Sequence, residues 1–297
     1  MTEITAFQQT QFDADGFLVI ESLLTSDLVA QLHDCFERVF AGNFETGIYP
    51  DEWYWRKEMS LPNVTRHMAN AWKSDLTIAS VVTSAKIGEI TARLAGWSGA
   101  RLGQDTLWWK PPGTKEIAQH QDDSFISYLN PPHMMSCWIA LDDTSEDAGT
   151  IEYTRGSHKW PLSPIPKDFH APENDYRWQM KVAAKAAGVT EPEICLMNVK
   201  AGDCIIHDGR IWHGSGPNTN ATRSRRALGV HTLARETEFS PSGGGYIYGR
   251  YKRIGETAMD ESFYPILWSA DGKRSDWLKD YCNDALSNDE SNAGRPD

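Results

Sequence analysis

The chain has 297 residues with 41 acidic and 29 basic side chains, and its formal net charge is −12 at pH 7. An acidic surface repels nucleic acid and anionic membranes, so we expect a small-molecule substrate and no nucleic-acid or membrane partner. The length suits one large domain or two small ones with a substantial core, and the composition says nothing of the oligomeric state.

The cysteines and the N-terminus indicate a reducing compartment. The five cysteines are scattered and show no Cys-x-x-Cys spacing, which argues against a disulfide framework or a zinc knuckle. The chain opens without a secretory signal, and it has no run of about 18 apolar residues that would predict a membrane span. We therefore expect a cytoplasmic protein.

The N-terminal third predicts helices around one short strand. Residues 12–16 are typical of a turn, and residues 17–20 of a buried strand. A helix is expected from Ser26 to about Gly42, because apolar residues recur there at helical spacing. Residues 43–73 sustain neither period and predict a long loop or lid. Residues 74–94 are helical in pattern, in one or two pieces, and Gly96 can close them in a left-handed cap.

From residue 100 onward the pattern changes to short apolar strands separated by turn residues. Six segments show it: residues 100–110, 134–141, 151–154, 199–206, 211–213 and 226–233. Residues 161–197 predict an insertion of loop and helix. Together these features predict a mainly β fold with flanking helices, a double-stranded β-helix (jelly roll) of the cupin-like kind. We expect a single domain over residues 1–286 and a disordered tail over residues 287–297.

One spacing suggests a metal site. His120 and Asp122 are two residues apart, so in an extended segment both side chains leave the same face. His213, in a separate predicted strand, could add a third ligand. Two imidazole nitrogens and one carboxylate oxygen leave coordination positions open and suit non-haem iron(II) in oxygenases. Because a His-x-Asp pair is common by chance, the surrounding sequence must show whether this pair binds metal.

The surrounding segments resemble the phytanoyl-CoA dioxygenase family of iron(II)- and 2-oxoglutarate-dependent oxygenases over roughly residues 12–233. The similarity lies in these segments: Asp15-Gly16-Phe17-Leu18-Val19-Ile20, Lys110-Pro111-Pro112-Gly113, His120-Gln121-Asp122, Trp138-Ile139-Ala140-Leu141-Asp142-Asp143, Gly156-Ser157-His158, Gly202-Asp203, and His213-Gly214-Ser215-Gly216-Pro217-Asn218 with Arg225 beyond it. One departure is Arg155, which stands where the family usually has proline before its Gly-Ser-His turn. This change affects a turn and not the metal.

The resemblance implies that His120, Asp122 and His213 hold iron and that 2-oxoglutarate takes two of the remaining positions. It also implies that Arg225 binds the distal carboxylate of 2-oxoglutarate, since the family has an arginine shortly after its distal histidine, before an apolar strand. A guanidinium pairs with a carboxylate through two hydrogen bonds. Arg223 is the alternative, because residues two apart can share a strand face.

The strand over residues 100–110 offers a further candidate. Its side chains alternate between two faces. One face carries Gln104, Thr106, Trp108 and Lys110, and the other carries Asp105, Leu107 and Trp109. By similarity to family members with a glutamine here, Gln104 is a candidate for binding the cosubstrate, the alternative being an ordinary polar strand residue. Trp108 would then line the pocket, unless it packs in the core.

Other polar and aromatic residues carry weaker expectations. His207 is expected to support a strand end rather than bind metal, and Asp123 to face away from Asp122. A further set of aromatic residues is expected either at the mouth of a substrate pocket or in the core: Trp53, Trp55, Tyr128, and Tyr246 and Tyr248 after the glycines at 243–245. His158 belongs to a turn and is expected to be structural. The remaining histidines show no partner spacing that indicates a role: His33, His67, His133, His170 and His231.

The resemblance implies hydroxylation of an unactivated C–H bond of a small-molecule metabolite, with consumption of 2-oxoglutarate and O2 and release of succinate and CO2. Halogenation is disfavoured because related halogenases lack the carboxylate that Asp122 supplies. The alternatives are desaturation or cyclisation at the same iron site, and a cupin-like metal-binding module without oxygenase activity. A zinc hydrolase is disfavoured, since no further general base is evident. The sequence does not identify the substrate.

Overall fold

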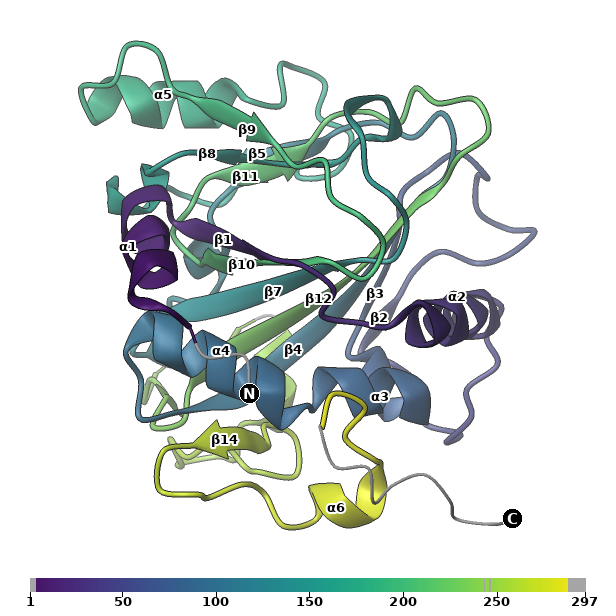
Figure 1. Ribbon diagram of the computed structural model, residues 1–297, viewed down its shortest axis with the longest axis vertical. Coiled ribbons are helices and arrows are strands. Elements are labelled where there is room, and N and C mark those ends of the chain that lie inside the picture. Colours follow the sequence, from purple (N-terminus) through teal and green to yellow (C-terminus); the bar gives the residue numbers. More distant parts are fainter. Residues whose placement is uncertain (1–3, 243, 246, 288–297) are drawn as a thin grey trace.

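Two antiparallel sheets form the centre of the computed structural model, which describes residues 4–242, 244–245 and 247–287 (Figure 1). The strand order of the larger sheet is β1 (Phe17–Ile20), β10 (Cys204–Asp208), β7 (Met134–Ala140), β12 (Arg225–Ala234), β4 (Gly99–Lys110), β3 (Arg66–Ala69) and β2 (Glu52–Trp53), with β14 (Ile266–Ser269) beside β4. The order in the smaller sheet is β5 (Ile117–His120), β11 (His213–Ser215), β8 (Ile151–Thr154) and β9 (Ile194–Leu196). A short pair, β6 (Leu129–Asn130) and β13 (Glu238–Phe239), lies apart.

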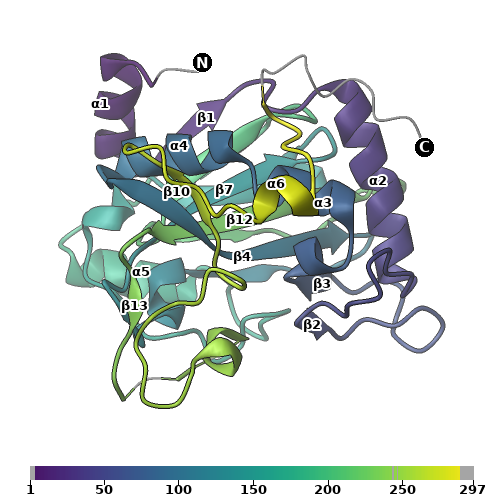
Figure 2. The same ribbon diagram turned by 90° about the horizontal axis from the view of Figure 1, so that it is seen from below.

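Helices cover the outer face of the larger sheet. They are α1 (Ala6–Asp15), α2 (Ser26–Phe40), α3 (Leu76–Val82), α4 (Ala85–Ala95) and α6 (Leu278–Tyr281), whereas α5 (Trp178–Ala186) lies beyond the smaller sheet. Figure 2 shows α3, α4 and α6 over the strands of the larger sheet. No helix in the described part of the chain is long and apolar enough to cross a membrane.

Strand alternation separates the core from the space between the sheets. On β4, Leu107 and Trp109 join the apolar core under the helices. Gln104, Thr106 and Trp108 face the other way, into a cavity that both sheets line. The predicted alternation of β4 is therefore confirmed, and the side chains of its inner face are in position to contact a ligand in the cavity.

Two predictions of local structure need correction, and a third lies almost wholly outside the described residues. Residues 12–15 end a helix rather than form a turn: Thr5 and Gln8 make a capping box, and Gly16 ends α1 in a left-handed cap. This helix lacks an apolar stripe, so the spacing of apolar residues did not predict it. Residues 43–73, predicted as a loop, contain β2 and β3, which pair along the edge of β4. Of the predicted tail, only Ser287 lies within the described residues.

The contact between α4 and β14 depends on one glycine. A Cβ atom at Gly88 would lie 2.7 Å from the Cβ of Leu267 and 3.2 Å from the backbone nitrogen of Trp268. Alanine at this helical position gains roughly 0.5–1 kcal/mol in propensity. Overpacking a tight contact costs about 1–3 kcal/mol, so the clash dominates.

We therefore expect Gly88→Ala to lower the free energy of unfolding by about 1 kcal/mol, measured by urea denaturation. Lys86→Ala, on the same helix, is the control and should change stability by less than about 0.5 kcal/mol. A Gly88→Ala protein as stable as the parent would show that β14 moves aside without cost.

Candidate metal centre

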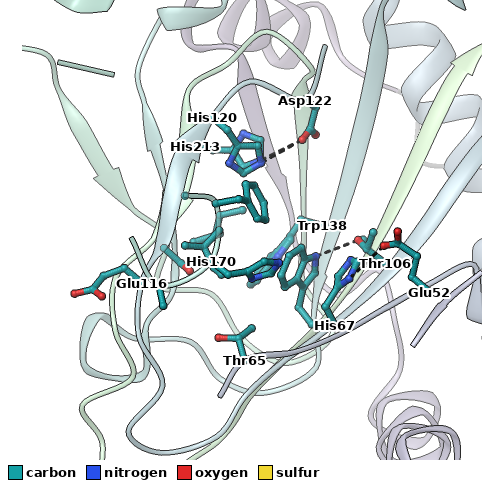
Figure 3. Close-up of a pocket in the computed structure, with 18 of the residues that line it drawn as sticks. Glu52, Thr65, His67, Thr106, Glu116, His120, Asp122, Trp138, His170 and His213 are labelled. Atoms are coloured by element: carbon teal, nitrogen blue, oxygen red, sulfur yellow. Dashed lines mark hydrogen bonds and ion pairs between the residues drawn. The ribbon is translucent and has the colours of Figure 1, made fainter. Parts of the chain in front are cut away.

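Three side chains meet at one end of the cavity between the sheets. His120 and His213 are partners across the β5–β11 ladder, and their ring centroids are 4.1 Å apart. Gln121 stays extended before a 3-10 turn begins at Asp122, so Asp122 leaves on the same side as His120. Its Oδ1 lies 3.4 Å from Nε2 of His120 and 3.6 Å from Nε2 of His213 (Figure 3).

The hydrogen bonds of the two imidazoles determine which nitrogen faces the centre. Nδ1 of His120 lies 2.9 Å from the carbonyl oxygen of Ala118, and Nδ1 of His213 lies 3.1 Å from that of Ile211. Because a carbonyl oxygen only accepts, both Nδ1 atoms carry the proton and both Nε2 atoms present lone pairs. Burial lowers the pKa of His213 well below its ordinary value, so this ring is neutral.

Three acceptor atoms therefore face one another: two imidazole nitrogens and Oδ1 of Asp122. Such a cluster is unfavourable unless a cation lies between its members. Two nitrogens and one oxygen, with open positions toward a cavity, fit iron(II). The donor set thus agrees with the metal that the sequence predicts.

The other oxygen of Asp122 is held by the protein. Oδ2 accepts a hydrogen bond of 2.8 Å from Oγ of Ser136 and one of 3.3 Å from Nε2 of His207. The hydrogen bonds from Ser136 and His207 stabilise the charged form of this carboxylate and offset the cost of its burial. The carboxylate is therefore an anion with one oxygen held in place and one available to a metal.

Ser136 is one member of a chain of hydrogen bonds that begins at Trp108. Nε1 of Trp108 donates to Oγ1 of Thr106 (3.1 Å), and this hydroxyl lies 3.2 Å from Nε2 of His231. Nδ1 of His231 lies 2.7 Å from Oγ of Ser136, which donates to Asp122. Since burial lowers the pKa of His231 to about 4, the ring is neutral and each group in the chain donates to the next.

Two basic side chains are buried side by side in the β4–β12 ladder. Nε and Nη2 of Arg225 donate to the carbonyl of Gly149 at 3.2 and 2.9 Å, and burial lowers the pKa of Arg225 to about 10. Nζ of Lys110, opposite Arg225 in the β4–β12 ladder, donates to Oγ of Ser215 at 3.0 Å. Within the described residues, neither cation has a carboxylate partner. An unpaired buried charge is costly, so the pair is suited to an anionic ligand.

The other candidate arginine is placed differently. Nη2 of Arg223 lies 3.1 Å from Oδ1 of Asp147, and half of its side chain is exposed. This pairing leaves Arg225 as the better match to a cosubstrate carboxylate. Gln104 lines the same cavity, and its Oε1 is buried without a hydrogen-bond partner in the described structure. The roles of Arg225 and Gln104 in binding the cosubstrate stay predictions.

The cavity also shows which residues the sequence reasoning missed. It has a volume of about 930 Å³, and His67, His170 and His231 line it, although no spacing had indicated them. Trp108 lines it and also packs against a core cluster, so both alternatives for this residue hold. Of the residues proposed for a mouth, Trp55 and Tyr248 line the cavity, whereas Trp53 packs against the core and Tyr128 against a smaller cluster. Gly243 and Tyr246 lie outside the described residues.

A second cluster of metal-binding residue types has a simpler explanation. The imidazole of His133 lies between two carboxylates, with Nδ1 2.8 Å from Oδ2 of Asp123 and Nε2 3.7 Å from Oδ2 of Asp208. Although burial opposes protonation, the hydrogen bond and charge of Asp123 raise the pKa of His133. Each ring nitrogen faces a different carboxylate, which suits a protonated histidine that joins them. As predicted, Asp123 faces away from the metal centre.

Comparison with known proteins agrees with this geometry. Residues 12–227 match the family model described as Phytanoyl-CoA dioxygenase (PhyH), which covers more than half of the chain. The chain belongs to the phytanoyl-CoA dioxygenase family. It is thus an enzyme of the iron(II)- and 2-oxoglutarate-dependent dioxygenases, with iron and 2-oxoglutarate as cofactor and cosubstrate.

Relatives in this family differ in their substrates and reactions. The chain is 27% identical to a probable alpha-ketoglutarate-dependent hypophosphite dioxygenase of Stutzerimonas stutzeri, over 75% of this chain and 77% of that protein. It is 29% identical to phytanoyl-CoA dioxygenase domain-containing protein 1 of Danio rerio, over 67% of each chain. The solved epimerase SnoN, in complex with Fe3+, alpha ketoglutarate and nogalamycin RO, has a TM-score of 0.66 at 19% identity and covers 88% of this chain and 97% of its own. This likeness confirms the predicted jelly-roll fold.

The hydrogen-bond chain gives a test of the metal centre. Ser136→Ala removes the donor that fixes Oδ2 of Asp122, so we expect iron(II) affinity to fall by about tenfold, measured by anaerobic titration. Ser74→Ala, a buried serine whose hydroxyl has no partner in the described structure, is the matched control and should leave the affinity unchanged. Equal affinities in both variants would remove Ser136 from the support of Asp122.

Proposed function

We propose that this chain hydroxylates an unactivated C–H bond of a small-molecule metabolite, with iron held by His120, Asp122 and His213. The carrying observation is the convergence of three unprotonated acceptor atoms in one cavity, which is also lined by a buried arginine without a carboxylate partner in the described structure. Arg225 would bind the distal carboxylate of 2-oxoglutarate, and Gln104 would contact the same molecule.

Iron bound at this centre, with 2-oxoglutarate and O2, supplies the oxidation that converts C–H to C–OH while 2-oxoglutarate becomes succinate and CO2. The protein's own contribution is to hold one C–H bond of the substrate near the metal and to exclude water from the site. Phe125 and Phe169 pack edge-on against the ring of His120, with centroids 5.9 and 4.7 Å away. These rings give the substrate an apolar wall directly beside the metal end.

The alternatives differ in their support. Family membership disfavours the metal-binding module without oxygenase activity. Desaturation, cyclisation or epimerisation would use the same residues, since these reactions differ in where the substrate lies relative to iron. They are the alternative reactions, and the epimerase SnoN has a similar fold. Product analysis separates them: hydroxylation incorporates one atom of 18O2 into the product, and the others leave the product without it.

The triad assignment is tested by absorption. Anaerobic protein titrated with iron(II) and then 2-oxoglutarate should develop the weak visible band of the iron–keto-acid chelate. Because each ligand is required, His213→Ala and Asp122→Ala should lose the band, while circular dichroism shows that they remain folded. A full band in either variant would reassign that ligand, and its absence in the parent protein with iron bound would reject the proposed function.

The role of Arg225 is tested against its neighbour. Loss of charge-assisted hydrogen bonds to a carboxylate should raise the 2-oxoglutarate concentration for half-maximal band formation by about 10- to 100-fold in Arg225→Ala. Arg223→Ala is the control, because its guanidinium pairs with Asp147 at the surface. The reverse ranking of the two variants would move the role to Arg223.

A further inference from the structure

A second path of hydrogen bonds reaches Asp122 from the smaller sheet. Tyr153 lies on β8, where it is the partner of His213 in the β11–β8 ladder, and its hydroxyl lies 2.9 Å from Nδ1 of His207. Nε2 of His207 lies 3.3 Å from Oδ2 of Asp122. Because His207 is on β10 of the larger sheet, this path joins the two sheets beside the three proposed metal ligands.

The residues of this path are shielded from solvent. The exposed fraction is 0% for Tyr153 and 2% for His207. The ring of Tyr153 stacks on Phe17, with centroids 5.0 Å apart and planes at 15°, and its centroid lies 5.1 Å from that of His207. Buried polar atoms need hydrogen-bond partners from the protein itself, so the contact between the hydroxyl and Nδ1 matters to both groups.

The carboxylate of Asp122 determines the direction of both hydrogen bonds. A carboxylate only accepts, so Nε2 of His207 carries a proton. The ring of His207 lies 4.6 Å from that of His213, where a bound cation would repel a second positive charge and favour a neutral ring. A neutral imidazole has one N–H, which leaves a lone pair on Nδ1, and the hydroxyl of Tyr153 donates to it.

The reverse arrangement is unfavourable. If Nδ1 of His207 carried the proton and donated to Tyr153, the lone pair of Nε2 would face the carboxylate oxygen of Asp122 in a buried space. If residue 153 had no hydroxyl, the lone pair of Nδ1 would be buried without a donor. The hydroxyl of Tyr153 therefore stabilises the one form of His207 that can donate to Asp122.

We propose that Tyr153 is a positioning residue of the metal centre: its hydroxyl keeps the proton of His207 on Nε2, where it holds Oδ2 of Asp122. Each donor to Oδ2 is then fixed by a further residue, Ser136 by His231 and His207 by Tyr153. Outer hydrogen bonds of this kind orient a metal ligand and tune its affinity. This inference rests on the proposed function, because it takes Asp122 as a ligand of iron.

The first test removes one hydroxyl and keeps the ring. Tyr153→Phe retains the stack on Phe17, but Nδ1 of His207 loses its donor. We therefore expect the dissociation constant of iron(II) to rise about tenfold, measured by anaerobic titration of the full-length protein. A Tyr153→Phe protein that binds iron(II) as tightly as the parent would overturn the proposal.

Tyr264→Phe is the matched control. The hydroxyl of Tyr264 is also buried and donates a hydrogen bond of 2.8 Å, to the carbonyl of Tyr248. Urea denaturation should show a comparable loss of stability in both phenylalanine variants, but Tyr264→Phe should bind iron(II) like the parent. An equal loss of iron(II) affinity in the control would assign the effect to the fold and overturn the role of Tyr153.

A double-mutant cycle tests whether the hydroxyl acts through His207. His207→Leu removes both ring nitrogens and leaves an apolar side chain in their place. In that background Tyr153→Phe should change the dissociation constant of iron(II) by less than about twofold, since the residue that carries the effect is gone. A further tenfold loss would overturn the proposal.

The proton of His207 can also be located without metal. In metal-free protein labelled with 15N-histidine, at mildly alkaline pH, the long-range proton–nitrogen spectrum should show a proton on Nε2 and a lone pair on Nδ1. The signal is assigned by its loss in His207→Leu. A proton on Nδ1 would overturn the proposal while leaving the proposed function intact, whereas a parent protein that binds no iron(II) would reject the proposed function itself.

Discussion

The carboxylate of Asp122 is the group on which the arrangement of the site depends. It is an anion in a buried position, where an unpaired charge is costly, and the protein stabilises it by dividing its two oxygens. Oδ2 accepts from Ser136 and His207, while Oδ1 faces the lone pairs of His120 and His213. The first set of contacts fixes the carboxylate, and the second becomes favourable only when a cation is shared. Rigidity and metal affinity thus come from the same residue.

This division requires two sheets. The smaller sheet supplies both imidazoles, because His120 and His213 are partners in the β5–β11 ladder. The larger sheet supplies both donors to Oδ2, because Ser136 lies on β7 and His207 on β10. It also supplies His231, which lies opposite Ser136 in the β12–β7 ladder. Asp122 follows β5 and reaches across to those donors. A shift of one residue in the β12–β7 register would turn His231 to the other face and break the chain of hydrogen bonds.

The sequence predicted the parts of the site that depend on local geometry or on family motifs. The His120–Asp122 pair is one such part, because Gln121 remains extended and the period of two holds across it. The roles of Ser136 and His231 could not be predicted, since they are 95 residues apart in sequence and meet only through strand register. His67 escaped for a related reason: it lies on β3, in a segment without a sustained period, whose pairing with β4 defines the strand. The helix α1 was missed because its capping box, rather than an apolar stripe, marks it.

The buried basic residues lie beyond the metal ligands along the same strands. In the β4–β12 ladder His231, beside Asp122, pairs with Gln104, whereas Arg225 pairs with Lys110 six residues away along β12. Burial, with the neighbouring Arg225, lowers the pKa of Lys110 well below its ordinary value. Trp108 pairs with Ala227, between these two positions, and its Nε1 begins the hydrogen-bond chain that reaches Asp122. A cosubstrate that extends from the three ligands toward Arg225 therefore runs beside an indole that is connected, through three side chains, to the carboxylate proposed to hold the metal.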